Sequence, residues 1–374
     1  MTKKLTAIVC LAGLTLFLCA CGSVFDKEYV AVSDYVPPAT EKLAGEKIKV
    51  SNYDGLKSAI SQLVSEGKSE GLISFDRGYK GDRSADLDSA CWEIKTQDAL
   101  CAYYVENISY ELTKVLQNYE AVVRVSYVDA GREAGDVIKL KYSTGIEEHI
   151  KKAFSEGKTK LPVLINRSSY TAEAMERLVS DVYMKNPGLA PSAPKVSVNM
   201  FSGNGIQRLY EINISYGMSH EELKAKQEQL NELKPFAGME DRLANASKGD
   251  RAVIACEYLF NKCSYSGEGQ NNSVYSALIS GTADSEGLSY AYAELCRQLE
   301  LECIVVFGQN NWEDYCWNIV EVDGNYYHVD MAKALTNGLD GAVLLRDENM
   351  WESHRWDLSS YPACKGQLTY SDFR

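Results

Sequence analysis

The side chain of Ser285 lies at a position where it could take part in catalysis. It lies in the stretch DSEGLSYAYAELC, residues 284–296, which predicts a helix that opens on a tight, acidic turn containing a glycine. The start of a helix favours negative charge, because free backbone N–H groups and the positive end of the helix dipole lie there. A serine hydroxyl at such a place still needs a neighbouring base before it becomes a nucleophile.

The other half of such a site is a hairpin that follows the helix. YCWNIVEVDGNYYHVD, residues 315–330, predicts two strands, and its Asp323-Gly324 pair is a strong signal for the tight turn between them. Tyr315 begins the first strand and Asp330 ends the second. A helix start that faces a hairpin is a common way to build a thiol active site. Here, however, no Cys stands at the helix start and no His at the strand start.

Three nearby side chains are candidates to replace the missing groups, and their spacing argues against each. His328 shares the strand face of Asp330 but lies about 6–7 Å further along it. Cys316 directly follows Tyr315, so strand alternation turns it to the opposite side. Cys296 lies about 16 Å along the helix axis from its start. We therefore expect none of them to act as a displaced base or nucleophile.

Four segments within residues 248–364 share an order and a spacing with a known family. They are Ser285-Glu286-Gly287, Tyr315-Cys316-Trp317-Asn318, Asp330, and the tail LLRDENMWESHRWDLSSYPAC. Together they resemble the core of the transglutaminase-like superfamily of papain-type thiol enzymes, in its bacterial form. In that family a Cys-x-Gly motif starts the helix, a His-Ala-Trp-Asn motif starts the strand, and an Asp ends the partner strand.

The resemblance implies a papain-like domain whose triad positions are Ser285, Tyr315 and Asp330, of which only Asp330 keeps the residue type of the family. A Tyr phenol, with an ordinary pKa of about 10, stays protonated at neutral pH and is a poor base. Losing one member of a triad costs orders of magnitude in rate, so we expect a catalytically inactive domain. The alternative is a weak hydrolase or acyl transferase that uses Ser285 with an unidentified base.

A polar cleft remains after these replacements, and we expect it to bind rather than react. Ser285, Tyr315 and Asp330 are expected to hydrogen-bond in series, with Tyr315 donating to Asp330. The candidates for ligand contact are the nearby side chains Trp317, Tyr290, Tyr327 and His328. Trp317 is nevertheless expected to pack in the core, and His328 to have a structural role. The expected function is a binding or scaffolding module for peptide, protein or cell-wall material, in this cleft or in the preceding part of the chain.

The elements that position these residues indicate an α+β fold. GLKSAISQLVSEGKSE and GIEEHIKKAFSEGKTK resemble each other, and the alternating strands EAVVRVSY and YEINISY follow at a similar spacing. We interpret this as a tandem pair of small α+β units, residues 50–140 and 141–218. A linking helix capped by Ser219 is predicted over 219–247, and the transglutaminase-like domain over 248–374.

The N-terminus predicts export and a lipid anchor. Lys3 and Lys4 precede an apolar run that is too short to span a bilayer comfortably, which is typical of a signal peptide over residues 1–20. LCAC followed by Gly-Ser resembles the bacterial lipoprotein box, which implies that Cys21 becomes the lipidated N-terminus. Residues 21–49 are expected to be a tether. The expected location is the outer surface of the cell membrane, held by the lipid.

Charge and cysteine content exclude further classes. The formal net charge of −13 gives no electrostatic basis for binding nucleic acid. Of the 11 Cys, eight follow Cys21, and no Cys-x-x-Cys pair occurs among them. The four His and the Cys show no zinc-ligand spacing, so no metal and no cofactor are expected. Most of the eight are expected to be buried free thiols.

Overall fold

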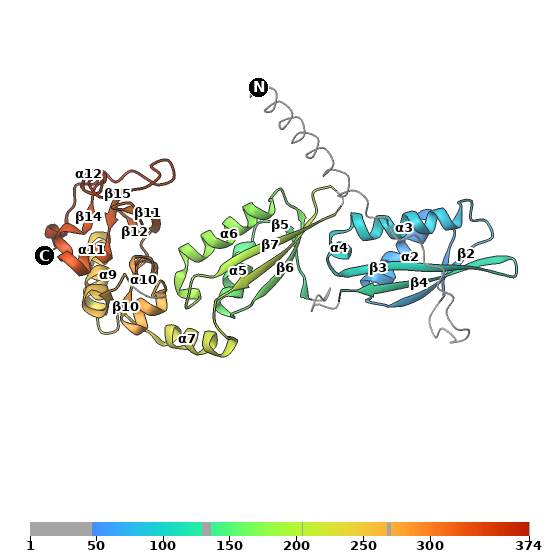
Figure 1. Ribbon diagram of the computed structural model, residues 1–374, viewed down its shortest axis with the longest axis horizontal. Helices are drawn as coiled ribbons and strands as arrows, with labels where there is room; N and C mark the ends of the chain where they lie inside the picture. The colour runs from blue at the N-terminus through green and yellow to red at the C-terminus, as the bar shows by residue number, and fades with distance from the viewer. Residues whose placement is uncertain (1–46, 129–135, 204, 268–270, 374) are drawn as a thin grey trace, which may run out of the picture. The chain divides into compact units, whose positions relative to one another are not determined.

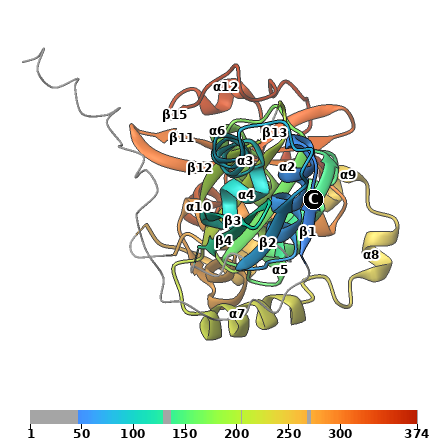
Figure 2. The same cartoon turned by 90° about the vertical axis from the view of Figure 1, so that its right-hand side faces the viewer.

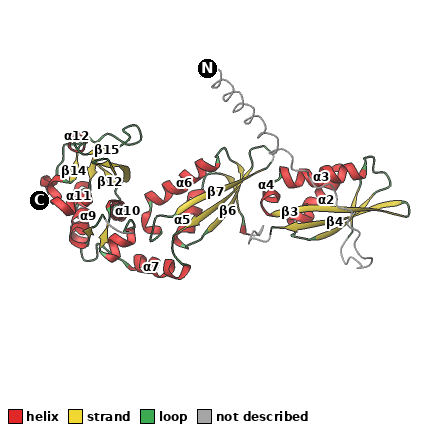
Figure 3. Cartoon of the chain, in the orientation of Figure 1, coloured by secondary structure: helices red, strands yellow, loops and turns green. Residues whose placement is uncertain are grey.

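The computed structural model describes residues 47–128, 136–203, 205–267 and 271–373 (Figure 1). The predicted signal peptide, Cys21 and nearly all of the tether lie outside these residues. The chain divides into two compact bodies. Of the described residues, one body comprises 47–91 together with Asn107–Ser126. The other comprises Trp92–Glu106 together with the described residues from Tyr127 onward. Helices and strands are mixed throughout, so the predicted α+β class is confirmed (Figure 3).

The first α+β unit is a four-stranded sheet with strand order β1-β2-β4-β3. Strand β1 pairs in parallel with β2, and β2 pairs antiparallel with β4. Its strands are β1 (Ile48–Val50), β2 (Glu70–Phe75), β3 (Val105–Val115) and β4 (Asn118–Tyr127), and its helices are α2 (Tyr53–Ser65), α3 (Arg83–Gln97) and α4 (Ala99–Tyr104). The predicted alternation in β4 is confirmed, because Val123 and Val125 are buried and Arg124 and Ser126 are not.

The second α+β unit has the same order of elements and of strands, β5-β6-β8-β7. Its strands are β5 (Ile138–Tyr142), β6 (Lys160–Arg167), β7 (Lys195–Ser202) and β8 (Arg208–Ser215), and its helices are α5 (Ile146–Ser155) and α6 (Ala172–Lys185). The shared order supports the proposal of a tandem repeat. The predicted boundary at residue 141 needs correction, because β5 begins at Ile138 and pairs in parallel with β6.

The predicted linking helix is two helices, α7 (His220–Glu232) and α8 (Glu240–Ala244), at the periphery of their body (Figure 2). Ser219 caps α7 as expected, since its hydroxyl accepts the N–H of Glu222 at 3.2 Å. The helix does not continue because Pro235 follows closely, and the residue before a proline is disfavoured in the α conformation.

The C-terminal domain is built on a five-stranded sheet in the order β14-β13-β12-β11-β15, and the pairs along it are antiparallel. The strands of this sheet are β11 (Cys303–Asn310), β12 (Glu313–Val322), β13 (Asn325–Val329), β14 (Val343–Leu345) and β15 (His354–Arg355). Asp323 and Gly324 have φ of 49° and 80°, so the predicted turn between β12 and β13 has the two left-handed residues of a type I′ turn.

Helix α10 (Ser285–Gln298) packs against β11 and β12 and against α9 (Lys248–Lys262). Short elements complete the domain: β9 (Ser264–Tyr265), a π-helical turn (Ser276–Ser280), β10 (Thr282–Ala283), α11 (Met331–Asn337), α12 (Asp347–Met350), and 3-10 turns at Leu339–Gly341 and Tyr370–Phe373. A further 3-10 turn, η2 (Pro187–Leu189), follows α6. Within the described residues, no helix is both long and apolar enough to span a bilayer.

The second α+β unit and the C-terminal domain share one hydrophobic core. Tyr183 of α6 meets Tyr290 of α10 edge to face, with ring centroids 5.3 Å apart. The N–H of Gly188 in η2 donates to Glu294 Oε2 at 3.2 Å. The two predicted domains are therefore parts of one compact body.

Candidate functional site

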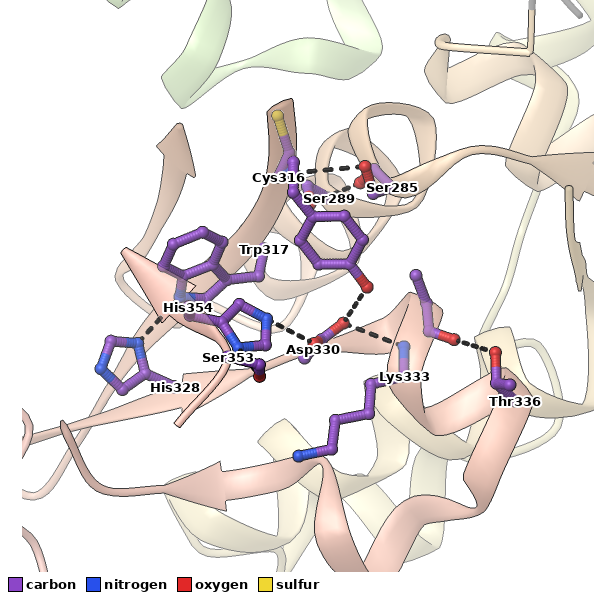
Figure 4. A network of polar contacts seen from close by, with 12 residues as sticks. Ser285, Ser289, Cys316, Trp317, His328, Asp330, Lys333, Thr336, Ser353 and His354 are labelled. Atoms are coloured by element: carbon purple, nitrogen blue, oxygen red, sulfur yellow. Dashed lines mark hydrogen bonds and ion pairs between the residues drawn. The ribbon is translucent and has the colours of Figure 1, made fainter. Parts of the chain in front are cut away.

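Ser285 occupies the first turn of α10, as predicted. Asp284 caps the helix, and its carboxylate accepts the N–H of Gly287 at 2.9 Å. The Ser285 hydroxyl accepts the backbone N–H of Cys316 at 3.3 Å, and its carbonyl accepts the Ser289 hydroxyl at 2.7 Å (Figure 4). Among the described residues, the N–H of Cys316 is the only hydrogen-bond partner of the Ser285 hydroxyl.

Gly287 allows this helix start to lie against the preceding segment. A Cβ at Gly287 would stand 2.5 Å from the carbonyl oxygen of Asn271 and 2.9 Å from the nitrogen of Ser273. Both are backbone atoms, which cannot move aside as a side chain can. The glycine in the Ser285-Glu286-Gly287 segment is therefore explained by close approach of backbone, independent of any chemistry at residue 285.

Two carboxyl groups flank Ser285, and both oppose negative charge on its hydroxyl oxygen. Burial raises the pKa of Asp284. Burial also raises the pKa of Glu286, whose oxygens accept from Asn272 and Tyr290 at 3.2 Å and 3.1 Å. The helix dipole favours an anion at this position, but the adjacent acids act against it.

Tyr315 donates its hydroxyl to Asp330 Oδ1 at 2.9 Å, which is the hydrogen bond expected from the sequence. Burial raises the pKa of Tyr315 well above its ordinary value, and the charge of Asp330 raises it further. The phenol therefore stays protonated and acts as a donor. The expected series does not extend to Ser285, because the Ser285 hydroxyl bonds the Cys316 backbone instead.

Cys316 turns away from this network, as strand alternation predicted (Figure 4). Its thiol is buried, and burial followed by the charges of Glu286 and Asp284 raises its pKa above the ordinary value. A thiol of this kind is a poor nucleophile, because the thiolate is the reactive form.

His354 belongs to the network, and sequence reasoning gave it no role. Its Nε2 lies 3.1 Å from Asp330 Oδ2, and its Nδ1 lies 2.9 Å from the Ser353 hydroxyl. His354 reaches Asp330 because β15 pairs with the end of β11, Asn310 opposite His354. The only sequence signal was that His354 lies in the tail that resembled the family.

Asp330 is consequently bonded on both oxygens. Oδ1 accepts from Tyr315 and from the N–H of Lys333, each at 2.9 Å, and Oδ2 faces His354. The Asp330 side chain is fully buried, and it also caps α11. These contacts satisfy both oxygens of a carboxyl group that has no access to solvent.

His328 has the structural role that the sequence suggested. The indole N–H of Trp317 donates to His328 Nδ1 at 2.9 Å, and His328 Nε2 lies 3.0 Å from Asp347 Oδ1. Burial is the main cause that lowers the pKa of His328, so the ring is neutral. Because Nδ1 accepts, the ring proton sits on Nε2 and points at Asp347.

The ligand-contact candidates need correction. Their side chains are all buried inside the domain: Trp317, Tyr290, Tyr327 and His328. Trp317 packs with Val306 and Ile319 as expected for a core residue, and Tyr290 faces Tyr183 in the shared core. These aromatic residues fill the interior, which sequence alone does not distinguish from a ligand surface.

His328, Asp347 and Cys364 form a buried group whose ligand atoms lie within 4.8 Å of one another. The hydrogen bonds do not suit a metal ion there. The nitrogen that faces the group carries the ring proton, and moving this proton to Nδ1 would set it against the Trp317 N–H. The backbone N–H of Cys364 also donates a hydrogen bond to Asp347 Oδ1, at 3.1 Å. The group is better explained as a hydrogen-bonded core network.

Residues 238–331 match the model of the transglutaminase-like superfamily, so the chain carries a transglutaminase-like domain. A solved transglutaminase structure is similar at 13% identity and a TM-score of 0.27, over 59% of this chain and 66% of the other, just under two thirds. A candidate cysteine protease from Cytophaga hutchinsonii is 10% identical with a TM-score of 0.21, over 46% of this chain and 70% of the other. A candidate protease from Parabacteroides distasonis is 9% identical with a TM-score of 0.20, over 76% of this chain and 69% of the other. No curated protein matches the chain.

Proposed function

We propose that the chain is an exported lipoprotein whose transglutaminase-like domain has a degenerate triad and serves as a binding or scaffolding module. The observation that carries the proposal is the hydrogen bonding of Tyr315. At the position where the family has its catalytic His, this residue donates a hydrogen bond to Asp330 through its hydroxyl. A phenol that stays protonated cannot act as the base that removes the proton of the Ser285 hydroxyl.

The surroundings of Ser285 support the same proposal. Its hydroxyl is held by a backbone N–H, and Asp284 and Glu286 lie on either side in the sequence. The hydrogen bonds of His328 and His354 go to other residues. A hydrolase or acyl transferase that uses Ser285 would need a base, and within the described residues no contact of the Ser285 hydroxyl supplies one.

The proposed ligand is peptide, protein or cell-wall material at the outer face of the membrane. The acidic chain, with a formal net charge of −13, favours neutral or basic partners over nucleic acid. The tandem α+β units are the second place where such a ligand could bind, because the cleft-side aromatic residues named from the sequence are buried.

The experiment combines a binding assay with a reactivity assay. The full-length chain and its Ser285→Ala variant are incubated with purified cell walls and sedimented, and both are assayed for peptide hydrolysis and amine transfer. The proposal expects equal sedimentation of the two proteins and no turnover by either. Turnover that is lost in Ser285→Ala contradicts it. The proposal is also contradicted if the chain neither binds cell walls nor retains any envelope protein after cross-linking.

A further inference from the structure

Ser353, His354 and Asp330 form a connected series of side chains apart from Ser285. The Ser353 hydroxyl lies 2.9 Å from His354 Nδ1, and His354 Nε2 lies 3.1 Å from Asp330 Oδ2. Both distances fall within the range that joins a nucleophile to its base and the base to an orienting carboxylate. Figure 4 shows Ser353 and His354 on the side of Asp330 that is remote from Ser285.

The proton positions in this series follow from Asp330. An ionised carboxylate only accepts, so the N–H of His354 that faces it must be on Nε2. In the neutral ring Nδ1 then carries a lone pair, and the group facing that lone pair is the Ser353 hydroxyl. Ser353 therefore donates to a nitrogen that is free to accept its proton, which is the relation that Ser285 lacks.

The base is buried, whereas the residue that carries the hydroxyl is only partly buried. His354 and Asp330 are 1% and 0% exposed, whereas Ser353 is only partly buried. The His354 ring contacts Tyr315 and Trp317 edge to face, with centroid distances of 5.5 Å and 5.0 Å. A base fixed by packing on two sides and by a carboxylate keeps one orientation toward the hydroxyl.

Two exposed tryptophan side chains belong to segments that border Ser353. The backbone N–H of Asn311, in the turn between β11 and β12, donates to the Ser353 carbonyl at 2.9 Å. The next residue, Trp312, is 77% exposed, and Trp351, two positions before Ser353, is 54% exposed. Arg355 lies over the Trp312 ring, 5.7 Å from its centroid, and donates to the Trp351 carbonyl. These contacts place both exposed indoles on elements that border Ser353.

The turn that carries Trp312 is strained. Asn311 and Trp312 have φ of 51° and 71°, in the left-handed region. Asparagine tolerates that region, but a bulky side chain at the second position costs about 1–3 kcal/mol where glycine would cost little. These two φ values are those of a type I′ turn, which joins β11 to β12 and holds Trp312 at the tip of the hairpin.

We propose that Ser353 is a nucleophile for esters with apolar acyl groups, with His354 as its base and Asp330 as the residue that positions His354. The Ser353 oxygen bonds the acyl carbon, and its proton passes to His354 Nδ1. The carbon–oxygen bond to the leaving alcohol breaks, and the alcohol takes that proton. Water then releases the acid by the same route. The indoles of Trp312 and Trp351 provide apolar surface for the acyl chain. This centre goes beyond the proposed function, which concerns the cleft at Ser285.

The test is labelling of the full-length chain with a fluorophosphonate probe, with the labelled peptide identified by mass spectrometry, beside hydrolysis of p-nitrophenyl butyrate. We expect the label on Ser353 and loss of both signals in Ser353→Ala. Asp330→Asn, which keeps the shape of the side chain, should slow labelling by about 100-fold while circular dichroism is unchanged. Ser359→Ala is the matched control, because Ser359 lies in the same tail and bonds Asp357 rather than an imidazole.

The outcomes of the labelling experiment distinguish the Ser353 centre from the proposed function, which concerns Ser285. A label on Ser353 supports the new centre and leaves Ser285 non-catalytic. A label on Ser285 overturns the proposed function, and it overturns the Ser353 centre as well if Ser353 stays unlabelled. Absence of labelling together with absence of ester hydrolysis overturns the Ser353 centre alone. Equal labelling of Ser353→Ala and the parent chain also overturns it.

Discussion

At the residue scale, the site is defined by which group holds each proton. Tyr315 donates a hydrogen bond to Asp330, and Trp317 donates one to His328. Among the described residues, the Ser285 hydroxyl has only the backbone N–H of Cys316 as a partner. The sequence was sufficient to predict the Tyr315–Asp330 bond, because both residues fall in a short hairpin with a fixed turn. It was not sufficient for His354, whose place depends on a two-residue strand pairing across the sheet.

The Tyr315 hydroxyl should stabilise the fold through Asp330. Tyr315→Phe removes one donor from a buried carboxylate and should lower the free energy of unfolding by about 1–3 kcal/mol. Urea unfolding followed by tryptophan fluorescence measures the change. Tyr326→Phe, on the neighbouring strand β13, is the control and should change it by less than about 0.5 kcal/mol. Equal effects of the two substitutions would contradict the role given to this hydrogen bond.

His328 should make the stability depend on pH. Its pKa is lowered in the folded state, mainly by burial, so the unfolded chain binds more protons at this residue. The contribution of His328 to the free energy of unfolding is constant above about pH 6.5, which is the pKa of this side chain in the unfolded chain. The contribution is lost as the pH falls below that value. Asp347, Asp330 and His354 are the titratable groups that act on the ring, and the two carboxylates oppose the shift.

The measurement for His328 is urea unfolding between about pH 7.5 and pH 5. The parent chain should lose stability on acidification, and His328→Gln should lose less between the same two values. A parallel loss in both proteins would show that other groups cause the pH dependence.

At the element scale, α10 and the β12–β13 hairpin could be predicted because each is specified locally. The helix has an acidic cap and helical spacing, and the hairpin has its Asp323-Gly324 turn. The sequence predicted two features less well. They are the break between α7 and α8 and the residue at which β5 begins. The break depends on Pro235, and the start of β5 depends on pairing with a strand after an intervening helix.

Gly287 sets how closely α10 starts against the preceding segment. Gly287→Ala places a methyl group against backbone atoms of residues 271 and 273 and should destabilise the fold by about 1–3 kcal/mol. Gly341→Ala is a matched control, because a Cβ there meets nothing within 4 Å. Thermal unfolding compares the two variants, and equal melting temperatures would contradict the close approach at Gly287.

At the scale of the whole molecule, the second α+β unit and the C-terminal domain share a core, which sequence reasoning treated as separate domains. The periodicity of each helix showed which face is apolar but not which partner covers it. This is also why Tyr290 was named as a ligand contact although Tyr183 covers it.

The eight cysteines after Cys21 are all free in the structure, and seven are buried. Burial raises the pKa of Cys91 to about 12 and that of Cys263 to about 11, which suppresses the thiolate. The folded chain beginning after Cys21 should therefore react slowly with Ellman's reagent, and the unfolded chain should release eight equivalents. Fewer equivalents, with a mass lower by two hydrogens for each missing pair, would reveal disulfides.

The central claim is that residue 285 lies in a papain-like site that lacks its base, and alkylation of an introduced thiol tests it most directly. Iodoacetamide rates at residue 285 are compared in Ser285→Cys and in Ser285→Cys with Tyr315→His. We predict that the single variant behaves as an ordinary thiol, losing reactivity below about pH 8.5, and that the double variant stays reactive near pH 6 through a thiolate–imidazolium pair. A single variant that already reacts near about pH 6 would mean that another base serves residue 285, and the account would be wrong.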